Sequence, residues 1–207
     1  MPDTYPIAYD VDYPDRRLNR LTSAFRIFTA IPIVIVLAAI GGMTEVATRG
    51  HTTTIAASGS AILFLPPLLL ILFRGKYPRW WFDFNVELLR FQNRVGVYVA
   101  LMDDRYPSTD EHQGVHLEVP YPDVARLNRG LPLVKWLLAL PHYIVLVFLS
   151  IGAVVAVVIA WFAILFTGRF PRGIFDYLVG VGRWTNRVSA YAFILVTDEY
   201  PPFRLRP

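Results

Sequence analysis

His142 is the residue whose type and position could do chemistry most directly. It follows Pro141 inside a long apolar run, and an ionisable side chain in such a run is by default a functional hypothesis. The plainer alternative is a neutral imidazole that bonds backbone carbonyls left free near the proline. A catalytic histidine needs a partner that sets its tautomer, and the apolar runs contain no Asp or Glu. We therefore expect a neutral, structural His142 bonded to local backbone, and keep it as a possible intramembrane polar site.

The other residue types that support catalysis or metal binding form no convincing pattern. His112 and His116 have the i, i+4 spacing of a metal-binding pair, but they fall in a polar linker, where solvated side chains are the better interpretation. The chain has no cysteine. Gly75 and Lys76 lack the earlier glycine and the following Ser or Thr of a phosphate-binding loop. We expect no enzymatic activity, no metal and no cofactor.

Arginine is the charged residue that recurs in the most regular way. Asp83 with Arg90, and Asp176 with Arg183, repeat at seven-residue spacing. Such pairs indicate a solvated helix face or contacts between helices, or a lipid-headgroup site, because arginine presents a planar fork to phosphate. The arginines adjoin apolar runs and form no separate basic domain, so we expect no nucleic-acid partner. The candidates for headgroup or partner contacts are Arg17, Arg20, Arg126, Arg129, Asp83, Arg90, Arg94, Asp176, Arg183 and Arg187.

Several motifs occur twice, in the same order along the chain. The sequence RLNR occurs at 17–20 and 126–129. The pattern FxGxxPR occurs at 73–79, as FRGKYPR, and at 166–172, as FTGRFPR. The copies are 109 residues apart at the first motif and 93 at the second, so copy one holds 16 extra residues, which fall around its polar loop at 44–54. Ordered matches of this kind predict a tandem repeat. We expect a first repeat at 1–107, a polar linker at 108–114 and a second repeat at 115–207.

The composition predicts an integral membrane protein. Of 207 residues, 55% are apolar and 17% charged, whereas soluble domains carry about 25% charged residues. A helix that crosses the bilayer needs about 20 apolar residues. We predict an all-α fold in which each repeat is a transmembrane hairpin followed by an amphipathic interfacial helix. The four spans are expected near 22–42, 55–73, 131–149 and 152–167, and the amphipathic helices near 81–102 and 174–195.

The second apolar run also allows one span, near 142–166, preceded by an interfacial helix. Charge favours the hairpin, because two hairpins place 19 of the 20 Lys and Arg residues on one side, as the positive-inside rule requires. We therefore expect both termini in the cytoplasm. The charge stripes of the amphipathic helices should also face the cytoplasm. Residues 7–13 and 115–119 alternate apolar and polar side chains and predict short cytoplasmic β segments that could pair.

The repeated pieces resemble a known family. The segments LPHYIVL, VVIAWFAILFTGRFPRGIFDYLVGVGRWTNRVSAY and TDEYPPF are similar to bacterial domain-of-unknown-function family 4389 (DUF4389). Copy two fits the pattern best, while copy one has Ile33 where the pattern has histidine. The resemblance implies a small bacterial membrane protein and supplies no activity.

The function that we expect is a non-enzymatic scaffold or accessory subunit of a complex in the bacterial cytoplasmic membrane. Its partners would be anionic lipid headgroups and either another protein or further copies of the chain. The alternative is a protein that binds or transports a lipid or small molecule, because helices could be broken around a site by Pro32, Pro66, Pro67 and Pro141.

Overall fold

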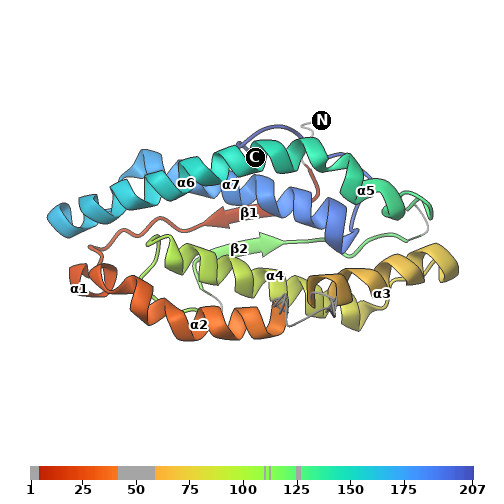
Figure 1. Cartoon of the computed structure of the whole chain (residues 1–207), viewed down its shortest axis with the longest axis horizontal. Helices are drawn as coiled ribbons and strands as arrows, with labels where there is room; N and C mark the ends of the chain where they lie inside the picture. Colours follow the sequence, from red (N-terminus) through yellow and green to blue (C-terminus); the bar gives the residue numbers. More distant parts are fainter. Residues whose placement is uncertain (1–4, 42–58, 110, 112, 125–126) are drawn as a thin grey trace, which may run out of the picture.

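The computed structural model describes residues 5–41, 59–109, 111, 113–124 and 127–207. Arg126, His112 and the polar loop at 44–54 lie outside these residues. Long helices run along the molecule on either side of a small central sheet (Figure 1). The elements in chain order are β1 Ala8–Val11, α1 Arg20–Ala24, α2 Arg26–Gly41, α3 Gly59–Arg74, α4 Arg79–Val99, β2 Val115–Glu118, α5 Pro132–Leu138, α6 Leu140–Thr167, α7 Arg172–Ser189 and the π-helical turn η1 Ala190–Ile194.

The two predicted β segments are present and paired. β1 and β2 are antiparallel, with Tyr9 opposite Leu117, which confirms the pairing expected from their alternation. In each strand one face is buried and the other exposed. The sheet lies between α7, which flanks β1, and α4, which flanks β2 (Figure 1).

The four-span prediction is wrong. Among the described residues, one helix, α6, is long and apolar enough to cross a membrane, and α2 and the described part of α3 are shorter apolar helices. The predicted hairpin of 131–149 and 152–167 is instead the short helix α5 followed by the continuous 28-residue helix α6. This arrangement has the form of the alternative with one span and a preceding helix.

Gly152, one of the two residues expected to form a turn in copy two, lies inside α6 and contacts α7. The Tyr177 hydroxyl of α7 donates a hydrogen bond to the Leu149 carbonyl at 2.8 Å, and a Cβ on Gly152 would lie 2.7 Å from that hydroxyl. The glycine therefore allows α7 to approach α6 closely. Ser150 is simply exposed on the helix, where a single serine is tolerated.

The amphipathic helices bury arginines as well as aromatic residues. On α4 and α7 the buried side chains include Arg94 and Arg187 as well as Phe91 and Trp184. Phe91 packs towards α2 and Trp184 towards α6. The arginines are directed into the chain rather than to solvent, because they bind backbone carbonyls there.

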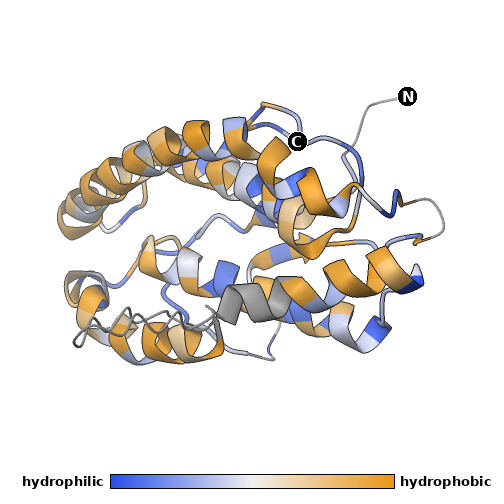
Figure 2. Ribbon diagram, turned by 45° about the vertical axis from the view of Figure 1, so that its right-hand side comes forward, coloured by the Kyte–Doolittle hydropathy of each residue, from blue (hydrophilic) through white to orange (hydrophobic). Residues whose placement is uncertain are grey.

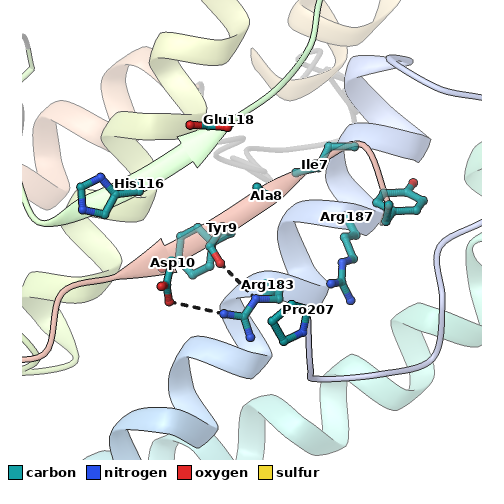
Figure 3. A pocket seen from close by; sticks show the side chains of 10 residues that line it. Ile7, Ala8, Tyr9, Asp10, His116, Glu118, Arg183, Arg187 and Pro207 are labelled. Atoms are coloured by element: carbon teal, nitrogen blue, oxygen red, sulfur yellow. Dashed lines mark hydrogen bonds and ion pairs between the residues drawn. The ribbon is translucent and has the colours of Figure 1, made fainter. Parts of the chain in front are cut away.

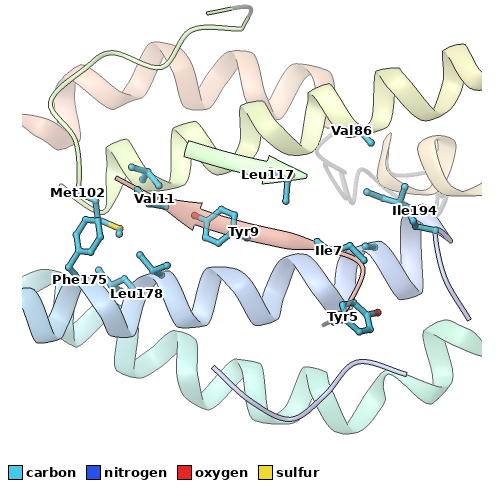
Figure 4. Packing of buried hydrophobic residues seen from close by; sticks show 14 of the residues in the cluster. Tyr5, Ile7, Tyr9, Val11, Val86, Met102, Leu117, Phe175, Leu178 and Ile194 are labelled. Carbon is cyan, nitrogen blue, oxygen red and sulfur yellow. The ribbon is translucent and has the colours of Figure 1, made fainter. Parts of the chain in front are cut away.

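The core lies between the sheet and its flanking helices. Tyr9, Val11 and Leu117 from the strands pack with Phe175 and Leu178 of α7 (Figure 4). Apolar residues also dominate the outer helices (Figure 2). Many of them are exposed, including Phe148 and Val154 of α6 at 70% and 65%. The protein thus has an apolar exterior along α6 and buried arginines inside.

Candidate functional site

Arg90 and Arg183 bind the outer edges of the two-stranded sheet. The Arg183 Nε donates to the Tyr9 carbonyl at 3.0 Å, and the Arg90 Nε donates to the Leu117 carbonyl at 3.2 Å. An unpaired strand edge exposes carbonyl oxygens that require donors. These two arginines therefore complete the sheet from α7 and α4.

The charged residues that recur at seven-residue spacing do not pair with each other. Arg90 pairs with Glu87 at 2.5 Å, and Arg183 approaches Asp10 at 3.4 Å. Asp176 lies 3.3 Å from Arg172, and Asp83 is exposed. Seven residues along a helix separate side chains by about 10 Å, so each charged group has taken a nearer partner.

Arg94 and Arg187 hold the segments that follow their helices. Arg94 Nη1 donates to the carbonyls of Ser108 and Thr109 at 3.0 and 3.1 Å. Arg187 donates to the carbonyls of Arg204 and Arg206 at 3.2 and 3.0 Å. Burial, and then the nearby charges of Arg204 and Arg183, lower the pKa of the Arg187 guanidinium. Among the described residues, no carboxylate lies within ion-pair distance of Arg187.

Two aspartates that the sequence reasoning passed over organise the RLNR motifs. Asp104 accepts the backbone N–H of Asn19 at 2.8 Å and pairs with the buried Arg26 at 2.5 Å. Asp198 accepts the N–H of Asn128 at 2.6 Å and pairs with the buried Lys135 at 2.7 Å. Arg26 and Lys135 are 109 residues apart, the same separation as the RLNR motifs, and this spacing was the signal that could have identified them.

The RLNR arginines lie against the ends of the apolar helices. Arg20 donates to the Phe166 carbonyl at 3.1 Å, and Arg17 lies beside it near Gly168. Arg129 occupies the matching place at Gly75, where an added Cβ would lie 3.2 Å from its Nη2. Both glycines have positive φ, 74° at Gly168 and 58° at Gly75, a conformation that favours glycine at a helix C-terminus.

His142 is fully buried but does not bond local backbone as expected. Its Nδ1 accepts the indole N–H of Trp184 at 3.0 Å, and its ring stacks on Phe203 with centroids 4.0 Å apart. The partner is therefore an α7 side chain that is remote in sequence. Nε2 has no hydrogen-bond partner in the described part of the chain.

A cavity with a volume of about 400 Å³ lies beside β1. Arg183 and Arg187 border it together with Asp10 and Glu118 (Figure 3). His116, from the suspected metal pair, also borders it and lies 3.0 Å from Asp12. The described residues contain no group of three or more His, Cys, Asp or Glu side chains that could hold a metal ion.

Residues 132–204 match the family model described as Domain of unknown function (DUF4389). This second part of the chain is similar to the DUF4389 family. A search of curated proteins found no match, and a search of solved structures found none either. The DUF4389 region begins at α5 and contains the Lys135–Asp198 pair, His142 with Trp184, and both cavity arginines. β1, which Arg183 binds, lies outside the DUF4389 region.

Proposed function

We propose that this chain is a non-enzymatic accessory protein of the bacterial cytoplasmic membrane, held in the bilayer by α6. The observation that supports it is the exposure of α6. Only 6% of its most apolar stretch is buried, and its 28 residues extend about 42 Å at 1.5 Å per residue. A hydrocarbon core about 30 Å thick would cover that surface.

Matched contacts support a duplicated unit within this membrane protein. Tyr13 donates to the Phe170 carbonyl and Tyr121 to the Tyr77 carbonyl, with donors 108 and acceptors 93 residues apart. The Asn93 and Asn186 amides, which are also 93 residues apart, bond each other at 2.8 Å. We infer that α2 and α3 together correspond to α6, since the extra residues of copy one fall between them.

A contact between the two ends of the chain supports placing the described parts of both termini on the same side of the membrane. The Tyr5 hydroxyl donates to the Glu199 carbonyl at 3.2 Å, so these segments lie together. Because α7 runs back alongside α6 (Figure 1), these segments lie near the end where α6 begins, where Tyr200 bonds the Leu138 carbonyl. Under the proposal that end faces the cytoplasm. Cysteines introduced singly at Glu199 and at Arg206 should react with an impermeant maleimide in inverted vesicles and not in intact cells.

Membrane insertion is tested by placing a charge on α6. Val154→Lys puts a charge on the exposed apolar face, which costs roughly 3 kcal/mol at the bilayer centre, whereas Gln92→Lys on the exposed side of α4 is the matched control. The wild type and the control should resist carbonate extraction of membranes, and Val154→Lys should accumulate to a much lower level there. Complete release of the wild type by carbonate would refute insertion.

The second candidate function, binding of a lipid or small molecule, rests on the cavity beside β1 and its two arginines. Purification in mild detergent, followed by mass spectrometry of proteins and lipids, separates the two candidates. A stoichiometric protein that persists through purification supports the accessory role. A single lipid or metabolite that is lost in Arg187→Gln supports the cavity instead.

A further inference from the structure

The C-terminal end of α6 combines exposed cations with an exposed aromatic ring. Phe166 is 78% exposed, and Arg20 bonds its carbonyl. Arg17 and Arg169 are exposed beside the same turn. Within the described residues, neither Arg17 nor Arg169 has a carboxylate partner.

The C-terminal end of α3 has the same combination. Phe73 is 75% exposed, and the guanidinium of Arg129 lies against Gly75. Lys76 and Arg129 are exposed, and neither pairs with a carboxylate among the residues that the structure describes. The two ends lie at opposite extremes of the long axis (Figure 1), and each draws its residues from both halves of the chain.

These cations differ from the other arginines of the protein. Arg90, Arg94, Arg183 and Arg187 use their donors on backbone carbonyls inside the fold. The acidic groups around the α6 end pair with other cations: Asp103 with Arg16 and Arg105, Asp104 with Arg26, and Asp176 with Arg172. Asp15 is exposed. A surplus of positive charge therefore remains at the molecule's ends.

We propose that each end binds the phosphates of anionic lipid headgroups, the pair Arg17 and Arg169 at one end and the pair Lys76 and Arg129 at the other. Arginine and lysine near an anionic membrane surface are attracted to it, and an aromatic ring beside them suits the boundary with the acyl chains. The exposed Phe166 and Phe73 favour a lipid over a free phosphate ion. This inference rests on the proposed membrane insertion of α6.

The test uses the full chain, purified in mild detergent, and measures its affinity for phosphatidylglycerol over phosphatidylcholine in mixed micelles. Arg17→Gln with Arg169→Gln removes one end, and Lys76→Gln with Arg129→Gln removes the other. Arg105→Gln with Arg206→Gln removes the same number of charges elsewhere and is the control. Each charge contributes roughly a factor of five to the affinity for an anionic lipid. Removing both charges at one end should therefore weaken phosphatidylglycerol binding at that end by about 30-fold.

The expected result is half the number of bound phosphatidylglycerol molecules in either end variant, almost none in the variant that combines both, and no change in the control. Retention of the full preference in the combined variant would overturn the proposal. Displacement of phosphatidylglycerol by millimolar inorganic phosphate would also overturn it, because the sites would then bind a free anion. Carbonate extraction of the wild type separately tests membrane insertion, so failure of either proposal can be recognised.

Discussion

The environment of His142 differs from that of Ile33, its counterpart under the proposed duplication. Ile33 packs with Phe91 in an apolar cluster, while His142 accepts the indole N–H of Trp184. Phe91 and Trp184 are 93 residues apart, so both members of the contact differ together. A buried indole N–H requires an acceptor, and His142 supplies it. The histidine therefore has a structural reason that does not involve catalysis.

Replacing one member of this pair should cost more than replacing both. His142→Ile leaves the Trp184 N–H buried without a partner, which costs about 1–3 kcal/mol. Adding Trp184→Phe should recover part of that loss, because it recreates the residue types of Ile33 and Phe91. Thermal unfolding in detergent measures the effect, with exposed His116→Gln as the control. If the double variant is less stable than His142→Ile by the full cost of Trp184→Phe alone, the pair is not coupled.

Buried tyrosines should make stability fall in alkaline solution. Desolvation by burial raises the pKa of Tyr5, Tyr9 and Tyr77 above the ordinary tyrosine value, so the folded state keeps protons that the unfolded chain releases above about pH 10. Each group then lowers the free energy of unfolding by about 1.4 kcal/mol per pH unit. Burial lowers the pKa of Lys135. Below the ordinary lysine pKa this shift makes the free energy of unfolding rise with pH, opposite to the effect of the tyrosines. The fall in stability should therefore begin near pH 10.

Tyr9→Phe isolates one of these contributions, because no hydrogen bond of the Tyr9 hydroxyl is found within the described residues. Its unfolding temperature should decline less steeply than that of the wild type between pH 10 and 11. Phe substitution of exposed Tyr106 is the control and should keep the wild-type slope. Identical slopes in all three proteins would contradict the sign assigned to the buried tyrosines.

The helices show which structural features the sequence could predict. Apolar periodicity correctly indicated amphipathic helices near α4 and α7, and alternation indicated both strands. It could not show that α6 continues through Gly152. The sequence does not distinguish a glycine that gives space to a neighbouring side chain, here Tyr177, from a glycine that forms a turn. Periodicity also could not show that Arg94 and Arg187 are buried, since their acceptors are carbonyls of segments that follow in the chain. The positive-inside argument therefore counted arginines that serve the fold.

Gly152→Ala should destabilise the contact of α6 with α7. The added methyl group would lie 2.7 Å from the Tyr177 hydroxyl, so the ring must move and its bond to Leu149 is lost, at a cost of about 1–3 kcal/mol. Tyr177→Phe in the same chain should remove most of this cost. Thermal unfolding of the four proteins of the cycle is the measurement, and Gly173→Ala, which meets no atom within 4 Å, is the control. A fully additive cycle would show that the two residues do not meet.

At the scale of the whole molecule, the two halves complete each other. Tyr9 of β1 packs against Gly182 of α7, where an added Cβ would lie 2.8 Å from the ring, and Arg183 binds the Tyr9 carbonyl. The motif matches predicted two units, but not that each unit would lend a strand to the other. Contacts between copies leave no periodic signal, because each residue retains its place in its own motif. The family match covers residues 132–204 and therefore omits both strands.

Residues 115–207 expressed alone should not form a stable monomer, because they lack β1. Adding residues 1–107 as a separate chain should restore a complex with one copy of each. Native mass spectrometry in detergent measures the composition, and Tyr9→Lys in the added chain, which cannot fit against Gly182, is the control that should abolish assembly. A monomer of 115–207 with the unfolding temperature of the full chain would contradict this dependence.

The pairing of β1 with β2 also sets the order of events during synthesis. Tyr9 cannot pair with Leu117 until the ribosome has synthesised the 108 residues between their positions. The contact of Tyr5 with Glu199 requires 194 residues of further synthesis. Loop closure over such distances slows folding, and an unpaired strand can associate with other chains meanwhile. β1 is thus synthesised early, but its contacts with β2 and α7 form late. The nascent chain should therefore be most prone to aggregation before α7 emerges.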